Sequence, residues 1–135
     1  MKRVNNVPDM THTLEAKTWR SAFGLATPDP TPETEALQET LLLEEIQEFT
    51  DAIQEENLDP SRDNTAHTLK ELADVVFVAY QYAAVRGFNL DLALTRVFES
   101  NMSKLGIDGK PFKDERGKVI KGPSYFLPQL DDLIP

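Results

Sequence analysis

The fold of this chain is decided by one stretch, LKELADVVFVAYQYAAVR, at residues 69–86. Apolar side chains recur there at spacings of three and four, which is the period of an α-helix. One helical face carries Leu69, Ala73, Val76, Phe77, Tyr80 and Ala84, and the opposite side carries Val75, Val78, Tyr82 and Val85. A helix that is apolar nearly all round is typical of the centre of a helical bundle.

Two acids, Glu71 and Asp74, interrupt this apolar helix at a spacing of three. Burying carboxylates without compensation is costly, and a divalent cation compensates well. A di-iron bundle site would have histidine three residues after the glutamate, a spacing that neither His12 nor His67 has. Ligation by oxygen alone therefore favours Mg²⁺ or Mn²⁺ over iron or zinc.

A second long helix is predicted upstream. Thr31, Pro32 and Glu33 form a helix start, with a capping hydroxyl, proline at the first helical position and an acid in the first turn. We expect the helix to run to about Glu56. Its apolar stripe consists of Leu42, Ile46, Phe49 and Ile53.

This second helix also carries Glu44, Glu45 and Glu48, which are neighbours at spacings of three and four. Like charges at these spacings repel each other by a few tenths of a kcal/mol, roughly, on an exposed helix. One interpretation is an ordinary solvated face. The other is that these acids meet Glu71 and Asp74 across a bundle and hold a cation there.

The remaining pattern completes an all-α fold. The other predicted elements are helices at Leu14–Phe23, Thr65–Arg86 and Leu90–Lys104, and a small hairpin with strands at Lys110–Lys113 and Lys118–Lys121. Thr11 or Thr13 is expected to cap the first helix, and Asn89 the fourth. We predict a single domain, residues 1–135, with a four-helix bundle over about 13–105 and a hairpin and extended arm over about 106–135.

Composition narrows the function classes. The chain has 14 basic and 23 acidic residues, so its net charge of −9 argues against nucleic acid and anionic membranes as partners. It has no cysteine, which excludes disulfides and thiolate chemistry. No apolar run approaches a membrane span, and the first ten residues lack the apolar core of a signal peptide. We expect a cytoplasmic protein.

The acidic segments resemble a known family. LEEIQEF at 43–49 and KELADVV at 70–76 are similar to the E-E-x-x-E and E-x-x-D signature of the MazG-like, all-α NTP pyrophosphohydrolases. WRSAFG at 19–24, NMSKL at 101–105, Gly109-Lys110 and KGPSY at 121–125 resemble the small phage and bacterial members. The resemblance covers about Leu14 to Leu127. Both acid pairs together with Asn-x-x-Lys, in this order, are far more specific than a single E-x-x-E.

The resemblance implies cleavage of a nucleoside triphosphate to the monophosphate and pyrophosphate, with Mg²⁺ or Mn²⁺ and two or more ions per site. It implies that the metal ligands are Glu45, Glu48, Glu71 and Asp74. Glu44 and Glu48 would be catalytic, with Glu44 holding a further ion or orienting the attacking water. Asn101 and Lys104 would contact phosphate, although a lysine at a helix end also occurs simply to reach solvent.

Base recognition is less constrained by the sequence. Trp19 and Phe23 are four apart and could flank a base, but aromatic residues at helical spacing are more often core. Tyr125 and Phe126, on the arm, could cover the site of their own or a neighbouring subunit. Family members usually form dimers or tetramers, so a homodimer or homotetramer is expected.

Length and tail character favour the phage MazZ type, which acts on dGTP and would work in the host cytoplasm. Three alternatives stay open. Two are enzymes, one that removes damaged nucleotides and one that resembles phosphoribosyl-ATP pyrophosphohydrolase. The third is an acidic helical module that binds a partner protein.

Overall fold

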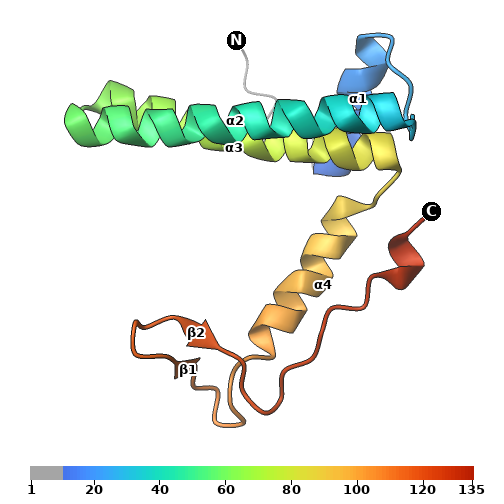
Figure 1. The fold of residues 1–135 in the computed structure, drawn as a ribbon. Helices are drawn as coiled ribbons and strands as arrows, with labels where there is room; N and C mark the ends of the chain where they lie inside the picture. The colour runs from blue at the N-terminus through green and yellow to red at the C-terminus, as the bar shows by residue number, and fades with distance from the viewer. Residues whose placement is uncertain (1–10) are drawn as a thin grey trace. The chain divides into compact units, whose positions relative to one another are not determined.

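The computed structural model describes residues 11–135 (Figure 1). The first ten residues, where we expect no signal peptide, lie outside the described residues. Within them the predicted all-α class is confirmed, with four α-helices and one hairpin of two short strands. No helix among them combines the length and apolar character needed to cross a membrane. The chain divides into two compact units, one up to Phe88 and one from Asn89.

The first unit begins with helix α1, His12–Ala22. It starts two residues before the predicted Leu14, because Thr11 provides the cap and its hydroxyl accepts a hydrogen bond from the Leu14 amide at 3.1 Å. Gly24 follows the helix in the left-handed region, at φ 70°, where a side chain would be strained. The buried Arg20 side chain donates to the Ala26 carbonyl at 2.9 Å and so fixes the start of the connector to α2.

Helices α2, Pro32–Leu58, and α3, Arg62–Arg86, form the main pair of the first unit. The Thr31 cap of α2 is as predicted. The predicted start of α3 at Thr65 is wrong by three residues, because Ser61 provides the cap. The two helices lie side by side in antiparallel directions (Figure 1), with Thr68 bonded to Glu56 at one end and Arg86 paired with Glu35 at the other.

The core of the first unit is thin and contains mostly small side chains. Its buried apolar residues are Ala16, Ala52, Tyr80, Ala83, Ala84 and Val85. The last two turns of α3, residues 80–85, are therefore mostly buried, as the sequence predicts for a central helix. The turns before them are not, since Leu69 is 66% exposed and Val76 48% exposed. The expectation that α3 is covered on all sides is correct only for these last turns within the described residues.

The second unit begins with helix α4, Leu90–Met102, capped by Asn89 as predicted. It ends two residues before the predicted Lys104, because the backbone tightens there into turns such as Lys104 N–H to Asn101 O at 3.2 Å. Strands β1, Phe112–Lys113, and β2, Val119–Ile120, pair antiparallel as the predicted hairpin, although they are shorter than expected.

The final segment, which includes a short 3₁₀ helix at Asp131–Leu133, is held along α4. Ser100 donates to the Phe126 carbonyl at 2.7 Å, and Arg96 donates to the Gln129 carbonyl at 2.8 Å. Arg96 also forms a two-point ion pair with Asp132, at 2.5 and 2.9 Å. The expected extended arm is thus tethered to α4 rather than projecting from it.

Replacing Asp132 by asparagine is expected to lower the melting temperature modestly at pH 7. The Arg96 guanidinium holds the pKa of Asp132 below the ordinary value of about 3.9 for an aspartate. Because the folded-state pKa is the lower one, the pair stabilises the fold above the unfolded-state pKa, and this contribution is lost as the pH falls through the folded-state pKa. Thermal unfolding should show the difference from wild type shrinking below about pH 4. A difference that grows on acidification would contradict the assignment.

Candidate metal centre

Three carboxylates from two helices meet in the first unit. The side-chain oxygens of Glu45 on α2 and of Glu71 and Asp74 on α3 include a set that lies within 4.8 Å of one another. These are three of the four acids implied as ligands. Their convergence follows from the packing of α2 against α3, which turns one acid of the first helix toward the i, i+3 pair of the second.

The most buried of these acids is Glu71, whose residue is 5% exposed. Its Oε2 is buried and receives no hydrogen bond within residues 11–135, and the same is true of Glu45 Oε2. A buried carboxylate oxygen without a hydrogen-bond partner loses its hydration, and no protein contact compensates for that loss. Two acids with such an oxygen, in one cluster with a third acid, fit a hard divalent cation, which prefers oxygen ligands.

The neighbouring carboxylates affect the pKa of Glu45. Its partial burial raises the pKa of its carboxyl, and the nearby carboxylates of Glu48, Asp74 and Glu71 raise that pKa further. A bound cation would reverse this effect, since the charge of an ion dominates the local electrostatics of its site.

Glu48 and Glu44 differ from Glu45 in their surroundings. Glu48 lies close enough to Glu45 to affect its ionisation, but it is exposed and outside the set of three acids. Glu44 is also exposed on α2. Both therefore occupy positions that water and a substrate can reach, next to a less accessible trio.

Two basic side chains contact the trio, and neither was anticipated. Lys70 Nζ lies 2.8 Å from Asp74 Oδ2 and 3.1 Å from Glu71 Oε1. His67 Nε2 lies 3.0 Å from Glu71 Oε1, and its Nδ1 is 3.7 Å from Glu55 Oε2. The signal was present in the sequence, because residues four apart on a helix are neighbours. His67 lacks the spacing of a di-iron ligand, but it stands four residues before Glu71.

These contacts act on the ionisation of both partners. Hydrogen bonds to Asp74 and then to Glu71 strongly raise the pKa of Lys70. The Lys70 ammonium, with help from His67, lowers the pKa of Glu71 despite its burial. Glu71 is therefore held as a charged carboxylate, which is the form that binds a metal ion.

The two aromatic residues considered for base binding lie at the surface and not in the core. Trp19 is 37% exposed and Phe23 is 66% exposed. Their ring centroids are 4.5 Å apart, whereas a base inserted between two rings needs about 7 Å, twice a contact distance. In this conformation a base cannot lie between the two rings. The Trp19 ring also meets Phe77 of α3 edge to face, with centroids 5.8 Å apart.

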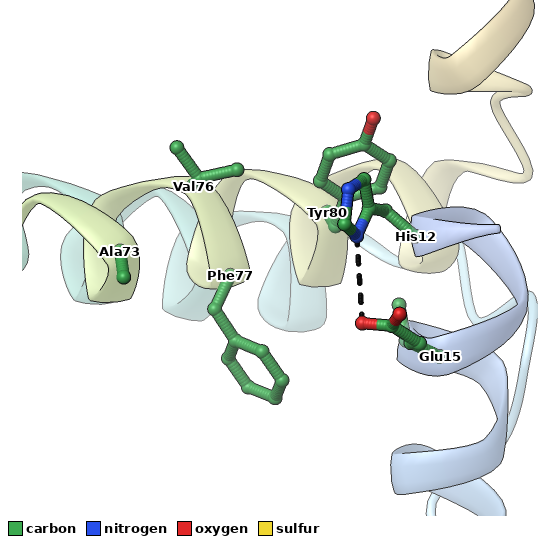
Figure 2. Close-up of a pocket in the computed structure, with 7 residues that line it drawn as sticks. His12, Glu15, Ala73, Val76, Phe77 and Tyr80 are labelled. Atoms are coloured by element: carbon green, nitrogen blue, oxygen red, sulfur yellow. Dashed lines mark hydrogen bonds and ion pairs between the residues drawn. The ribbon is translucent and has the colours of Figure 1, made fainter. Parts of the chain in front are cut away.

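A mostly apolar pocket of about 370 Å³ lies between α1 and α3. Figure 2 shows its lining, with the His12 ring beside Tyr80 and bonded to Glu15. The lining residues are His12, Glu15, Ala16, Ala73, Val76, Phe77 and Tyr80. The sequence did not reveal this pocket, because its walls come from two helices about sixty residues apart in the chain.

The remaining candidate residues belong to the second unit. Asn101 is exposed near the end of α4, and Lys104 is half-buried just beyond it. Lys104 lines a small pocket together with Lys118 and Lys121 of the hairpin region. Lys121 Nζ lies 4.8 Å from the ring centroid of Tyr125, which is a cation–π contact. These side chains make this part of the unit locally basic.

A protein-family model described as the MazG nucleotide pyrophosphohydrolase domain matches residues 33–107, which is more than half of the chain. The matched segment includes the three converging carboxylates and extends past Asn101 and Lys104. A comparison with curated proteins gives no match.

Proposed function

Because the chain belongs to the MazG nucleotide pyrophosphohydrolase family, we propose that it hydrolyses a nucleoside triphosphate to the monophosphate and pyrophosphate, with dGTP or GTP preferred. Family membership makes it a hydrolase of nucleotide pyrophosphate bonds. The observation that supports the triphosphate reaction best is the trio of carboxylates in the matched region, with a buried oxygen on Glu71 that has no hydrogen-bond partner in residues 11–135. The guanine preference rests on the resemblance of length and tail to the phage type.

We propose that Glu45, Glu48, Glu71 and Asp74 hold Mg²⁺ or Mn²⁺, with two or more ions per site. When bound, the metal would neutralise phosphate oxygens and lower the pKa of the attacking water. Exposed Glu48 or Glu44 then accepts the proton from that water as its oxygen attacks the α-phosphorus. The bond between the α- and β-phosphates breaks, and pyrophosphate leaves.

We assign the substrate contacts from the chemistry of the side chains. Trp19 and Phe23 offer exposed ring faces for a base, and the neighbouring α1–α3 pocket is apolar, as nucleotide and ligand pockets commonly are. Asn101 and Lys104 suit phosphate oxygens, and Tyr125 belongs to the same basic part of the second unit. The family match runs across Phe88 and Asn89, so we propose that both units belong to one functional domain.

We also propose a homodimer or homotetramer. Helix α3 exposes Leu69, Leu72 and Val76 at spacings of three and four, which is a continuous apolar stripe. Helix α2 exposes Leu43 and Ile46 in the same unit. Contiguous exposed apolar surface is rarely left open in water. A second copy of the chain offers the same surface in return, as a two-fold interface requires.

A nucleotide panel tests the reaction. With Mn²⁺ or Mg²⁺, we expect pyrophosphate release from dGTP or GTP to exceed that from the other nucleotides, and Glu48→Ala to abolish it. Glu39→Ala provides the matched control, since Glu39 is another exposed glutamate of α2. Oxidised nucleotides and phosphoribosyl-ATP in the panel separate the alternative enzymes. No release from any member, with Glu48→Ala indistinguishable from wild type, would sink the proposal.

A further inference from the structure

The carboxylate trio already has a cation beside it, supplied by the chain. The ammonium of Lys70 bridges Asp74 Oδ2 and Glu71 Oε1, at 2.8 and 3.1 Å. We propose that Lys70 is the resident counter-ion of the metal-free site, which a divalent metal must displace in order to bind. This inference rests on the proposed metal site at Glu45, Glu71 and Asp74.

The need for a counter-ion follows from burial. Glu71 is almost fully buried next to two further carboxylates, and uncompensated charges in such a place are destabilising. Lys70 and His67 are the basic side chains that contact Glu71 within residues 11–135. Of these, Lys70 alone also reaches Asp74, so its ammonium holds together the pair that interrupts the apolar helix.

Displacement is feasible because the ion pairs of Lys70 are made by its ammonium and most of its side chain is exposed. Its side chain is 63% exposed, and a flexible lysine stem lets the ammonium leave without disturbing the packing. The Lys70 ammonium does not provide a hydrogen bond to every oxygen of the trio. Glu71 Oε1 contacts both Lys70 and His67, whereas Glu71 Oε2 contacts neither and has no hydrogen-bond partner in the described part of the chain. A metal ion would use the same carboxylates and offer more bonds than the ammonium does.

Two consequences follow for the protein without nucleotide. The ammonium stabilises the metal-free fold, since it lowers the repulsion within the trio. It also weakens metal binding, because its contacts must be broken first.

The test compares Lys70→Met, which keeps the stem and removes the charge, with Lys70→Arg, which keeps the charge. Lys17→Met is the matched control, since Lys17 is an exposed lysine on α1 of the same unit. Mn²⁺ binding is measured by calorimetry on the full chain without nucleotide, and melting temperatures are measured in chelator and at saturating Mn²⁺. We expect Lys70→Met to bind Mn²⁺ about fivefold more tightly than wild type.

The melting data provide the second readout. Lys70→Met should melt at a lower temperature than wild type in chelator and close to wild type at saturating Mn²⁺. Lys70→Arg and Lys17→Met should resemble wild type in both. Equal or weaker Mn²⁺ binding by Lys70→Met, in a variant whose circular dichroism is unchanged, overturns the inference and leaves the metal site standing. Absence of Mn²⁺ binding by the wild type overturns both.

Discussion

Replacing Glu71 by glutamine is expected to reduce kcat/KM for nucleotide hydrolysis by about a thousandfold. Glutamine keeps the shape of the side chain and removes its charge at the most buried position of the trio. A bound metal contributes several kcal/mol to charge stabilisation in the transition state, and loss of about 4 kcal/mol corresponds to a thousandfold in rate. Steady-state kinetics with the preferred nucleotide measures the effect.

The same variant separates a metal ligand from a structural residue. Saturating Mn²⁺ should raise the melting temperature of the wild type by mass action, and this shift should be absent in Glu71→Gln. Glu39→Gln, on the exposed part of α2, should keep both the activity and the shift. A Glu71→Gln enzyme with activity within about tenfold of wild type would be inconsistent with a role for this carboxylate in metal binding.

The double substitution Leu69→Asp and Val76→Asp is expected to dissociate the proposed oligomer into monomers. Both side chains are exposed on one stripe of α3, seven residues apart. Burial of such a side chain in an interface contributes about 1.5–3 kcal/mol. Loss of the two contributions of one copy raises the dissociation constant by about 10² to 10⁴, and a two-fold interface loses the same two from the other copy. Size-exclusion chromatography with light scattering, over a range of protein concentrations, gives the mass directly.

Leu58→Asp serves as the control, because Leu58 lies at the end of α2 and is 88% exposed without belonging to the stripe. It should leave the mass of the oligomer unchanged. Two results would contradict the proposed interface. One is a wild-type chain that is monomeric at micromolar concentration, and the other is a double variant that keeps the wild-type mass.

Local structure was largely predictable, because its causes lie within a few residues in the chain. Thr31 before Pro32, Asn89 before α4 and Gly87 after α3 mark helix ends through hydrogen bonds or backbone angles that span one turn. The predicted start of α3 was wrong because Ser61, upstream of Thr65, provides the cap. Several residues near a helix start can act as the cap, and the sequence alone does not show which one does.

By itself the sequence determined the helices and the presence of acids in an apolar helix, Glu71 and Asp74. It did not determine which glutamate of α2 joins them. Glu44, Glu45 and Glu48 share one acidic segment, and the rotation of α2 about its own axis is set by how it packs on α3. That packing turns Glu45 inward and leaves the other two exposed.

Tertiary structure also decided the charge balance of the site and the surface around it. The four-residue spacing of Lys70 and Asp74 allows an ion pair. The ammonium is stabilising there because it compensates the negative charge of the buried Glu71. The apolar pattern of α3 likewise predicts that its faces are buried, but it does not predict which residues bury them. The last two turns of the helix are covered by the core of the first unit, and much of the rest stays exposed because the small side chains of that unit bury too little of it.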